Sequence, residues 1–276
     1  MATRDDRRRS REREYEEGLV VIQEMVNKLN TILQEGTQSF TSADYMRFYT
    51  TIYNLTTAHP IREYSPELYE KYKETFEEHI NYKVLPSLRG KKDQDLLQEL
   101  VTKWANYKIM TRWLFRFFHY LDRYFIPNRR LPSLQETSFI AFYNLVYGEI
   151  NEQVRNTVIS MINQERNGEV IDQDLVKSTV TIYVEMGIES MKYYERDLEA
   201  SLLKESAAFY SEKASKWIQN ESYEDYMYLV ERCLKHEKEI VSSYLPATTQ
   251  DKIIQAVEHE LLQEKASELE GKKMIW

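Results

Sequence analysis

The sequence predicts an all-α protein in which long helices are joined by short connections. Glycine and proline, the residues that interrupt helices most strongly, are scarce, with 7 and 6 among 276 residues. Apolar residues recur at intervals of three and four, which is the spacing of one buried helix face. The first such stripe comprises Leu19, Ile22, Val26, Leu29 and Leu33. No segment alternates apolar and polar residues as a half-buried strand does.

Residues 1–14 precede this stripe and are rich in arginine, with no apolar residue between Thr3 and Glu14. This composition is typical of a solvated, disordered tail, which is what we expect here. Nuclear import or contact with RNA is the alternative, which the interleaved acidic residues Asp5, Asp6 and Glu12 weaken.

Capping residues predict where the next helices begin. The first helix ends at Gly36, and a T-x-x-D capping box formed by Thr41 and Asp44 begins a second helix that runs to about Thr56. The Ser65-Pro66 pair predicts an N-cap followed by proline at the first position of a third helix.

Loops and prolines predict the boundaries in the rest of the chain. We expect a loop at 89–93, helical spacing over 96–104, and another helix over 109–126 that stops before Pro127. A basic linker over 129–133 then leads to a long helix, which we expect over 135–166. We expect a turn at Asn167-Gly168, followed by a helix from Asp172 to Gly187. Three helical segments over 189–245 and a charged helix from about Thr249 complete the prediction.

Composition restricts the class of protein. A net charge of −8 argues against a chain that coats nucleic acid. The single cysteine, Cys233, excludes an intramolecular disulfide and a multi-cysteine zinc site. No apolar run approaches the roughly 18 residues that cross a membrane, and the N-terminus lacks the apolar core of a signal peptide. We therefore expect a protein of the nucleus and cytoplasm, with no nucleic-acid or membrane partner.

Motifs that carry chemistry are missing from the sequence. It contains no G-x-G-x-x-G, Walker, H-E-x-x-H or G-x-S-x-G motif, and its histidines are too scattered to predict a metal site. The clustered aspartates of an all-helical terpenoid-type enzyme are also missing. We therefore expect no enzyme, no catalytic residue, no metal and no cofactor.

The predicted second helix has more apolar surface than one core contact requires. Placing residues at 100° per step puts Phe48, Ile52 and Leu55 on one face, which we assign to the core. The uncharged arc covers about 220°, whereas a core stripe needs little more than 100°. The residues left for a second face are Tyr45, Met46, Tyr49, Thr50 and Tyr53. They predict either a partner interface or a helix sandwiched between neighbours.

The predicted helix over 109–126 has a basic stripe with aromatic edges. Arg112, Arg116, Arg123 and His119 make the stripe, and Trp113 and Tyr120 border it. Such a stripe could meet an acidic protein or nucleic acid, or it could be a solvated face partly neutralised by Asp122.

The same two segments resemble the cullin family. The likeness rests on an ordered set of segments: DYMRFYTTIYNLTT (44–57), RWLFRFFHYLDRYFIPNRRLPSL (112–134), ERNGEVID (165–172), IYVEMG (182–187), FYSEKASKWIQNES (209–222) and DYMYLVERCLKHEKEIVSSYL (225–245). It covers about residues 15–262 and is strongest toward plant cullins that scaffold Skp–cullin–F-box ubiquitin ligases.

The resemblance implies a right-handed stack of five-helix cullin repeats, an α-α solenoid-like stalk. It implies a first repeat over 15–134, a second over 135–247 and the start of a further repeat over 248–276. It also implies that the second and fifth helices of the first repeat bind an acidic Skp-type adaptor, which carries F-box proteins. The residues that the resemblance implies at this contact are Tyr45, Met46, Tyr49, Tyr53, Tyr120 and Arg116. Together with Thr50, Arg112 and Trp113 from the two helix faces described above, they are the residues that we expect to bind the partner.

The likeness fades after Leu262, whereas cullins continue into a third repeat and a C-terminal domain that binds a RING protein. We therefore expect a non-catalytic scaffold in a truncated or competing form, with no RING partner. A generic helical tether with a different partner is the alternative.

Overall fold

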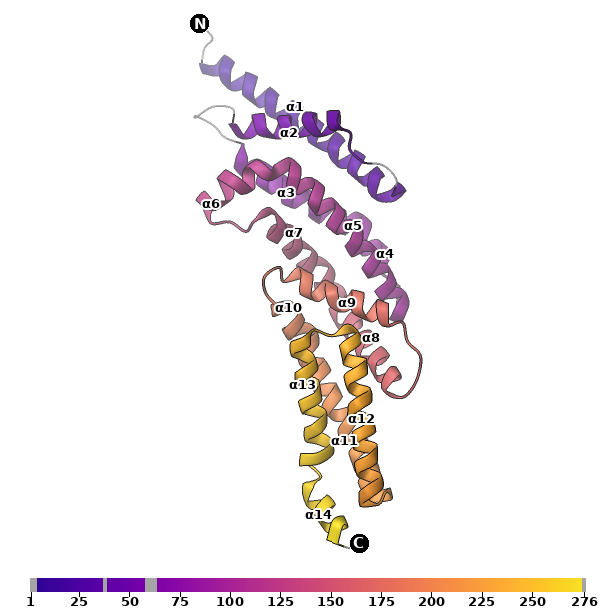
Figure 1. Ribbon diagram of the computed structural model, residues 1–276. Helices are drawn as coiled ribbons and strands as arrows, with labels where there is room; N and C mark the ends of the chain where they lie inside the picture. The colour runs from indigo at the N-terminus through magenta and orange to yellow at the C-terminus, as the bar shows by residue number, and fades with distance from the viewer. Residues whose placement is uncertain (1–3, 37–38, 58–63, 275–276) are drawn as a thin grey trace. The chain divides into compact units, whose positions relative to one another are not determined.

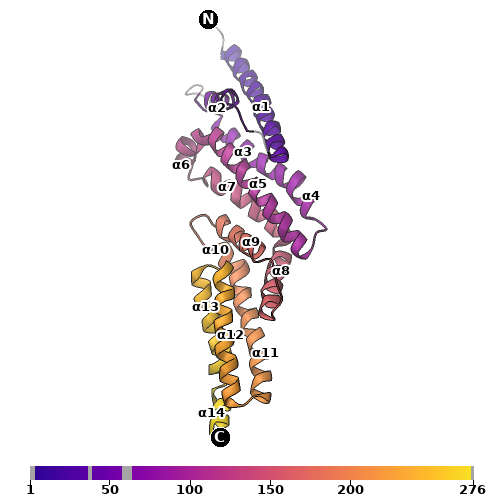
Figure 2. The same ribbon diagram turned by 45° about the vertical axis from the view of Figure 1, so that its right-hand side comes forward.

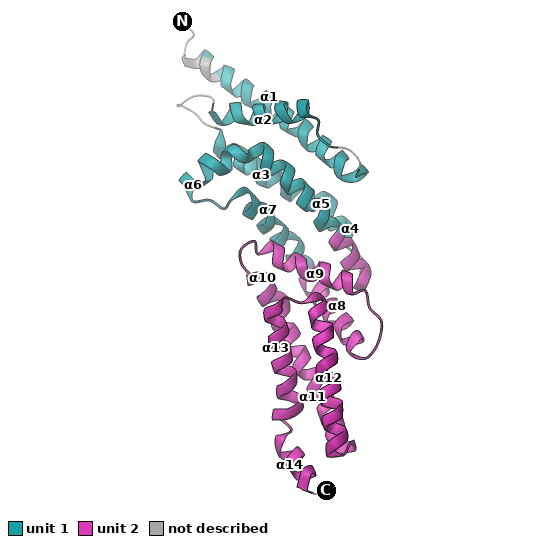
Figure 3. Ribbon diagram, in the orientation of Figure 1, with its two compact units in different colours: residues 1–89, 102–149 teal, residues 90–101, 150–276 magenta. Residues whose placement is uncertain are grey.

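The computed structural model describes residues 4–36, 39–57 and 64–274, and every regular element in these ranges is helical (Figure 1). The all-α prediction is thus confirmed. The chain forms two compact units, which Figure 3 shows in different colours. Unit 1 comprises residues 1–89 and 102–149, and unit 2 comprises residues 90–101 and 150–276.

Unit 1 contains seven helices of the described chain, in whole or in large part. They are α1 (Arg4–Glu35), α2 (Ser42–Thr57), α3 (Ser65–His79), α4 (Leu85–Leu88), α5 (Asp93–Tyr120, from residue 102 on), α6 (Ile126–Arg129) and α7 (Leu134–Phe142). Helix α1 packs along α2, and α3 packs along α7. Buried aromatic side chains fill the core, and the Tyr72 and Tyr107 hydroxyls donate hydrogen bonds to the carbonyls of Leu134 and Ser138 at 2.9 Å and 2.6 Å. These bonds satisfy polar groups that burial would otherwise destabilise.

Helix α1 begins at Arg4, so the expectation of a disordered tail over 1–14 is wrong for residues 4–14. Residues 1–3 lie outside the described residues. Arginine and glutamate are good helix formers, and opposite charges one turn apart stabilise a helix, as in the 3.3 Å pair of Arg13 and Glu17. The ring of Tyr15 also stacks on that of Tyr64, with centroids 4.4 Å apart.

Prolines lie inside helical rods in unit 1 because a π-helical turn precedes each of them. The turn η1 (Ile80–Val84) precedes Pro86, and η2 (Leu121–Phe125) precedes Pro127. The wider i→i+5 turn moves the preceding carbonyls away from the proline ring, which would clash with them in a regular α-helix. The prediction that the helix stops before Pro127 is therefore wrong, because α6 carries it on to Arg129.

Two other predicted boundaries differ from the structure. The segment predicted over 96–104 and the first part of that over 109–126 form one helix, α5, because no glycine or proline separates them. The rest of the second segment lies in η2 and at the start of α6. Ser65 is the first residue of α3 and is buried, while Tyr64 takes the N-cap position. The capping box of Thr41 and Asp44 is confirmed, since the Asp44 amide donates to the Thr41 hydroxyl at 3.1 Å.

Unit 2 contains the remaining helices of the described chain. They are α8 (Gly148–Arg166, from residue 150 on), α9 (Gln173–Met186), α10 (Lys192–Tyr194), α11 (Ala200–Asn220), α12 (Tyr223–Tyr244), α13 (Ala247–Glu258) and α14 (Ala266–Met274). Unit 2 also contains π-helical turns at Glu195–Glu199 and His259–Gln263, and a further such turn at Tyr143–Tyr147 lies in unit 1. Helices α11, α12 and α13 lie side by side in both views (Figures 1 and 2), and α13 packs against the other two.

The predicted turn and cap between α8 and α9 are confirmed. Gly168 has a φ of 89°, which glycine adopts without strain, and the Asp172 carboxylate accepts a hydrogen bond from the Leu175 amide at 2.9 Å. Gly187 closes α9, as expected.

Candidate functional site

Helix α2 is fixed on α1 by polar contacts at its start. The Lys28 ammonium lies 2.6 Å from the Asp44 carboxylate, and the Arg47 guanidinium lies 2.6 Å from Glu24. The hydrogen bonds from Lys28 and Thr41 lower the pKa of Asp44 to about 2. Because Asp44 carries its charge at the N-terminal end of α2, it also suits the helix dipole. The orientation of α2 about its own axis is therefore defined.

One face of α2 is buried, as the periodicity predicts. Phe48, Ile52 and Leu55 are almost fully buried. The Phe48 ring meets that of Phe117 on α5 edge to face, with centroids 5.8 Å apart. A Cβ added at Gly18 of α1 would come within 2.6 Å of the Leu55 side chain, so glycine permits the close approach of α1 and α2 here.

The flank of α2 next to this buried face carries a row of tyrosines that continues onto α5. The rings of Tyr45, Tyr49 and Tyr53 stack in succession, with centroid separations of 6.0 Å and 6.2 Å. Tyr53 then meets Tyr120 edge to face at 5.2 Å, and Tyr120 contacts Tyr124 at 4.5 Å. We call these five residues the tyrosine row. Tyr53 remains 40% exposed and Tyr124 46% exposed, so the row presents aromatic surface to solvent.

Met46 and Thr50 lie beside the tyrosine row on α2. Met46 is 60% exposed and Thr50 is also exposed, so neither belongs to the core of unit 1. A methionine side chain is flexible and apolar, and it adapts to the shape of a partner. Within the described chain, the second face that the sequence predicts on α2 is thus exposed at Met46, Thr50 and Tyr53 and half-buried at Tyr45 and Tyr49.

Trp113 and Arg116 extend the same surface along α5. The Trp113 ring packs against Phe40 at 4.9 Å and Phe117 at 6.0 Å, and Tyr45 contacts the same Phe117 at 5.6 Å. The Arg116 guanidinium lies 5.1 Å from the centroid of the Trp113 ring. This is a cation–π contact, which holds the Arg116 side chain over the indole. Arg116 is exposed and forms no carboxylate ion pair within the described part of unit 1.

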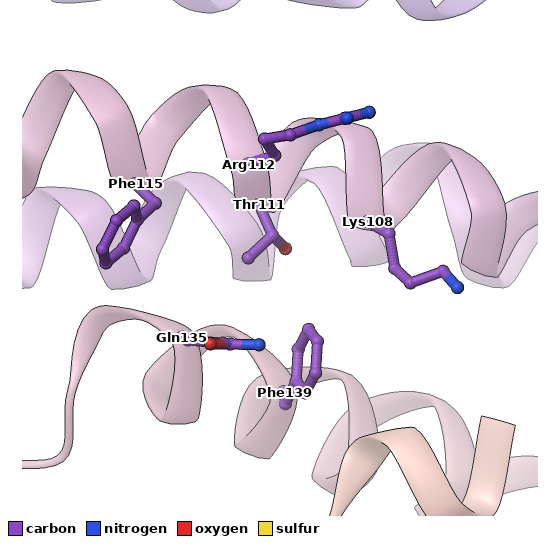
Figure 4. A pocket seen from close by; sticks show the side chains of 6 residues that line it. All are labelled: Lys108, Thr111, Arg112, Phe115, Gln135 and Phe139. Carbon is purple, nitrogen blue, oxygen red and sulfur yellow. The ribbon is translucent and has the colours of Figure 1, made fainter. Parts of the chain in front are cut away.

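Arg112 lies one helical turn before Arg116 on α5, at the edge of this surface that borders α7. It lines a pocket of about 460 Å³ between α5 and α7, together with Lys108, Thr111, Phe115, Gln135 and Phe139. Figure 4 shows Phe115, Gln135 and Phe139 directed into the gap between the two helices, while the Arg112 side chain extends away from α7. The nine predicted residues thus form one surface from α2 and α5, with Arg112 at its edge.

Sequence patterns did not identify Tyr124, a member of this surface, or Phe40, a buried ring beneath it. Tyr124 lies four residues after Tyr120, and this spacing alone could have indicated it. Phe40 precedes α2 and is buried between Phe48, Trp113 and Phe117, and no periodicity marks an aromatic residue in a connection.

The arrangement suits binding to another protein. Over the part of the chain that the structure describes, histidine, cysteine and carboxylate side chains do not gather in threes as a metal site requires. Within the same ranges, no helix has the length and apolarity of a membrane span. An exposed aromatic surface with an arginine at its edge is typical of protein interfaces.

Comparison with known proteins identifies the family to which the chain is similar. The family model for the cullin alpha solenoid domain matches residues 22–275. The chain is 51% identical over 257 residues to Cullin-1 of Oryza sativa subsp. japonica, covering 93% of this chain and 34% of that protein. It is 42% identical over 263 residues to Putative cullin-like protein 2 of Arabidopsis thaliana, covering 94% of this chain and 70% of that protein. It is 40% identical to Cullin-2 of Arabidopsis thaliana, covering 92% of this chain and 34% of that protein.

These matches and the stacked helices define the protein class as an α-solenoid. The chain belongs to the cullin family of scaffold proteins, and it spans about a third of the length of the rice Cullin-1 and Arabidopsis Cullin-2 proteins that it matches. The sequence-based assignment to this family is confirmed.

Proposed function

We propose that this chain binds an acidic Skp-type adaptor and so acts as the adaptor-binding arm of a Skp–cullin–F-box ubiquitin ligase scaffold. The binding surface is the tyrosine row with Met46, Thr50, Trp113 and Arg116, and Arg112 lies at its edge. Through the adaptor the arm would hold F-box proteins. Its role in the ligase would be to position the adaptor and the F-box protein, and it would supply no catalytic residue.

One observation carries this proposal: α2 buries Phe48, Ile52 and Leu55 and leaves Met46 and Tyr53 exposed. Helix α2 therefore supports its own unit with one face and offers a second apolar face to a partner. Tyrosine and arginine are enriched among the residues that dominate binding energy at interfaces.

Charge supports an acidic partner for this surface. Arg47 and Lys28 on the side of α1 are neutralised by Glu24 and Asp44. Arg112 and Arg116 have no such carboxylate within the described part of unit 1, so their charge is available to a partner. Complementary charge at an interface mainly raises the association rate and selects the partner.

The proposal is tested by mixing the purified full chain with a purified Skp-type adaptor and analysing the mixture by size-exclusion chromatography with light scattering. We expect a complex with one copy of each protein. If the two proteins elute separately at micromolar concentrations, the chain is not an adaptor-binding arm, and a helical tether with a different partner becomes the better interpretation.

A further inference from the structure

Unit 2 contains a pocket between α11 and α12 that has no relation to the tyrosine row. Its volume is about 410 Å³, which lies within the range of small-molecule sites. We call it the α11–α12 pocket. Its lining residues are Arg166, Tyr210, Lys213, Trp217, Leu229, Arg232, Cys233, Lys235, His236 and Glu239.

The base of the pocket is a neutralised and rigid polar network. Arg166 and Glu237 are both buried, and the guanidinium donates to the Glu237 carboxylate at 2.5 Å and to the Ser206 hydroxyl at 2.8 Å. The Tyr210 hydroxyl also donates to Glu237. The Glu237 carboxylate therefore accepts hydrogen bonds from both Arg166 and Tyr210.

Lys213 is a half-buried cation beside this network without a carboxylate partner in the described chain. Its ammonium donates to the carbonyl of Arg166 at 3.3 Å and lies 4.5 Å from the centroid of the Phe209 ring. Burial lowers the pKa of Lys213, because removal from water destabilises its charged form. By contrast, Lys216 on the same helix is exposed and pairs with Glu212 at 2.5 Å.

The rim of the pocket adds further positive charge. Arg232 and Lys235 lie on α12, are exposed, and pair with no carboxylate among the described residues. Glu239 is the one carboxylate in the lining. Apart from the neutralised Arg166, three cations thus face one carboxylate, although the whole chain carries a net charge of −8. A local excess of cations on an acidic protein favours an anionic ligand.

We propose that the α11–α12 pocket binds a small ligand that carries phosphate groups. Lys213 binds phosphate oxygens at the base, while Arg232 and Lys235 bind them at the rim. Trp217 and Leu229 form the less polar wall against the rest of the ligand. Lysine and arginine are the usual phosphate-binding side chains, and their hydrogen bonds to phosphate are stronger than those between neutral groups.

Cys233 provides a reporter for this site, since it is the one cysteine of the chain and lines the pocket. Burial raises the pKa of the Cys233 thiol, so we expect slow alkylation of the full chain by N-ethylmaleimide. Sodium tripolyphosphate is the probe, at low ionic strength. We expect it to slow alkylation in a saturable manner, by about fivefold or more when the pocket is filled.

Variants show whether the protection comes from this pocket. Lys213→Met should weaken tripolyphosphate binding about tenfold, because one charge-assisted hydrogen bond is lost. Lys216→Met, the matched control on α11, should bind as the wild type does. Arg232→Gln should weaken tripolyphosphate binding severalfold. Because Arg232 is exposed on the rim, this variant tests the pocket even if Lys213→Met does not fold.

Three results would overturn the proposal. The first is no protection at millimolar tripolyphosphate. The second is equal weakening in the Lys213 and Lys216 variants, which indicates nonspecific attraction. The third is protection by oligoglutamate without protection by tripolyphosphate, which indicates a site for an acidic peptide.

Discussion

The rings of Tyr53 and Tyr120 meet edge to face, with centroids 5.2 Å apart and an interplanar angle of 87°. This contact joins α2 to α5 within unit 1 and makes one continuous aromatic surface from two helices. Tyr53 is partly exposed and Tyr120 half-buried, so the pair lies at the boundary between core and surface. It holds the two halves of the proposed adaptor surface in register.

The Tyr53–Tyr120 contact should be measurable as a coupling free energy. Edge-to-face aromatic pairs contribute about 0.5–1.5 kcal/mol beyond the area that they bury. We therefore expect the single changes Tyr53→Ala and Tyr120→Ala to be non-additive by that amount in a double-mutant cycle followed by urea denaturation. Additivity within about 0.3 kcal/mol would show that the two helices are held together by other contacts.

Arg116 should act mainly on the rate of association with an acidic adaptor. We expect Arg116→Gln to lower the association rate constant severalfold at low salt and to weaken its salt dependence, with little effect on the fold, because the side chain is exposed. The measurement is stopped-flow binding at several ionic strengths. Arg89→Gln is the control, since Arg89 is an exposed arginine of unit 1 whose charge Glu149 neutralises at 2.8 Å. Equal effects of both changes would reject a local role for Arg116.

His79 should make the stability of the protein depend on pH. Burial, with smaller effects of Lys103 and Lys83, lowers its pKa from 6.5 to about 4. Between these values the unfolded state binds a proton that the folded state does not, so the free energy of unfolding falls as the pH decreases. For this residue we expect a loss of about 2 kcal/mol between pH 7 and pH 4.5.

The measurement is urea denaturation of the wild type and of His79→Leu at both pH values. Leucine cannot take up a proton, so the loss should be smaller in the variant by the same 2 kcal/mol. Other titrating groups act equally in both proteins. Identical pH dependences would show that folding does not lower the pKa of His79.

The buried pair of Arg166 and Glu237 should be far more sensitive to removal of one partner than of both. Arg166→Met leaves an unpaired carboxylate in the core and should lower the free energy of unfolding by about 3–5 kcal/mol. The double change Arg166→Met with Glu237→Leu should recover much of this loss, because no charge is left buried. Urea denaturation measures both. A double variant as unstable as the single one would mean that the network is needed for packing rather than for charge balance.

Local patterns predicted the part of the site that lies on a single helix. The 100° spacing in α2 separated the buried Phe48, Ile52 and Leu55 from the exposed Met46. This was possible because the apolar residues of an amphipathic helix recur with the helical period on the side that faces the core. The capping box at Thr41 was predictable for the same reason, since its bonds span only three residues.

Contacts between distant residues left no such pattern. Arg166 and Glu237 are 71 positions apart, and nothing in their neighbours marks either as buried. The π-helical turns before Pro86 and Pro127 also escaped prediction, because the general rule that proline ends a helix holds only where the preceding turn is a regular one. The helical start of α1 was missed because composition alone does not report the opposite charges one turn apart.

The affinity of the Tyr49→Lys variant for a Skp-type adaptor, measured by isothermal titration calorimetry, tests the proposed binding surface most directly. Tyr49 lies in the middle of the row on α2, between Tyr45 and Tyr53. Tyr82→Lys is the matched control, since Tyr82 is a 76% exposed tyrosine of unit 1 outside the row. We predict that Tyr49→Lys weakens binding by about 2 kcal/mol or more, as expected for a central interface anchor, and that Tyr82→Lys leaves it unchanged. Wild-type affinity in the Tyr49 variant would contradict the assignment of this surface.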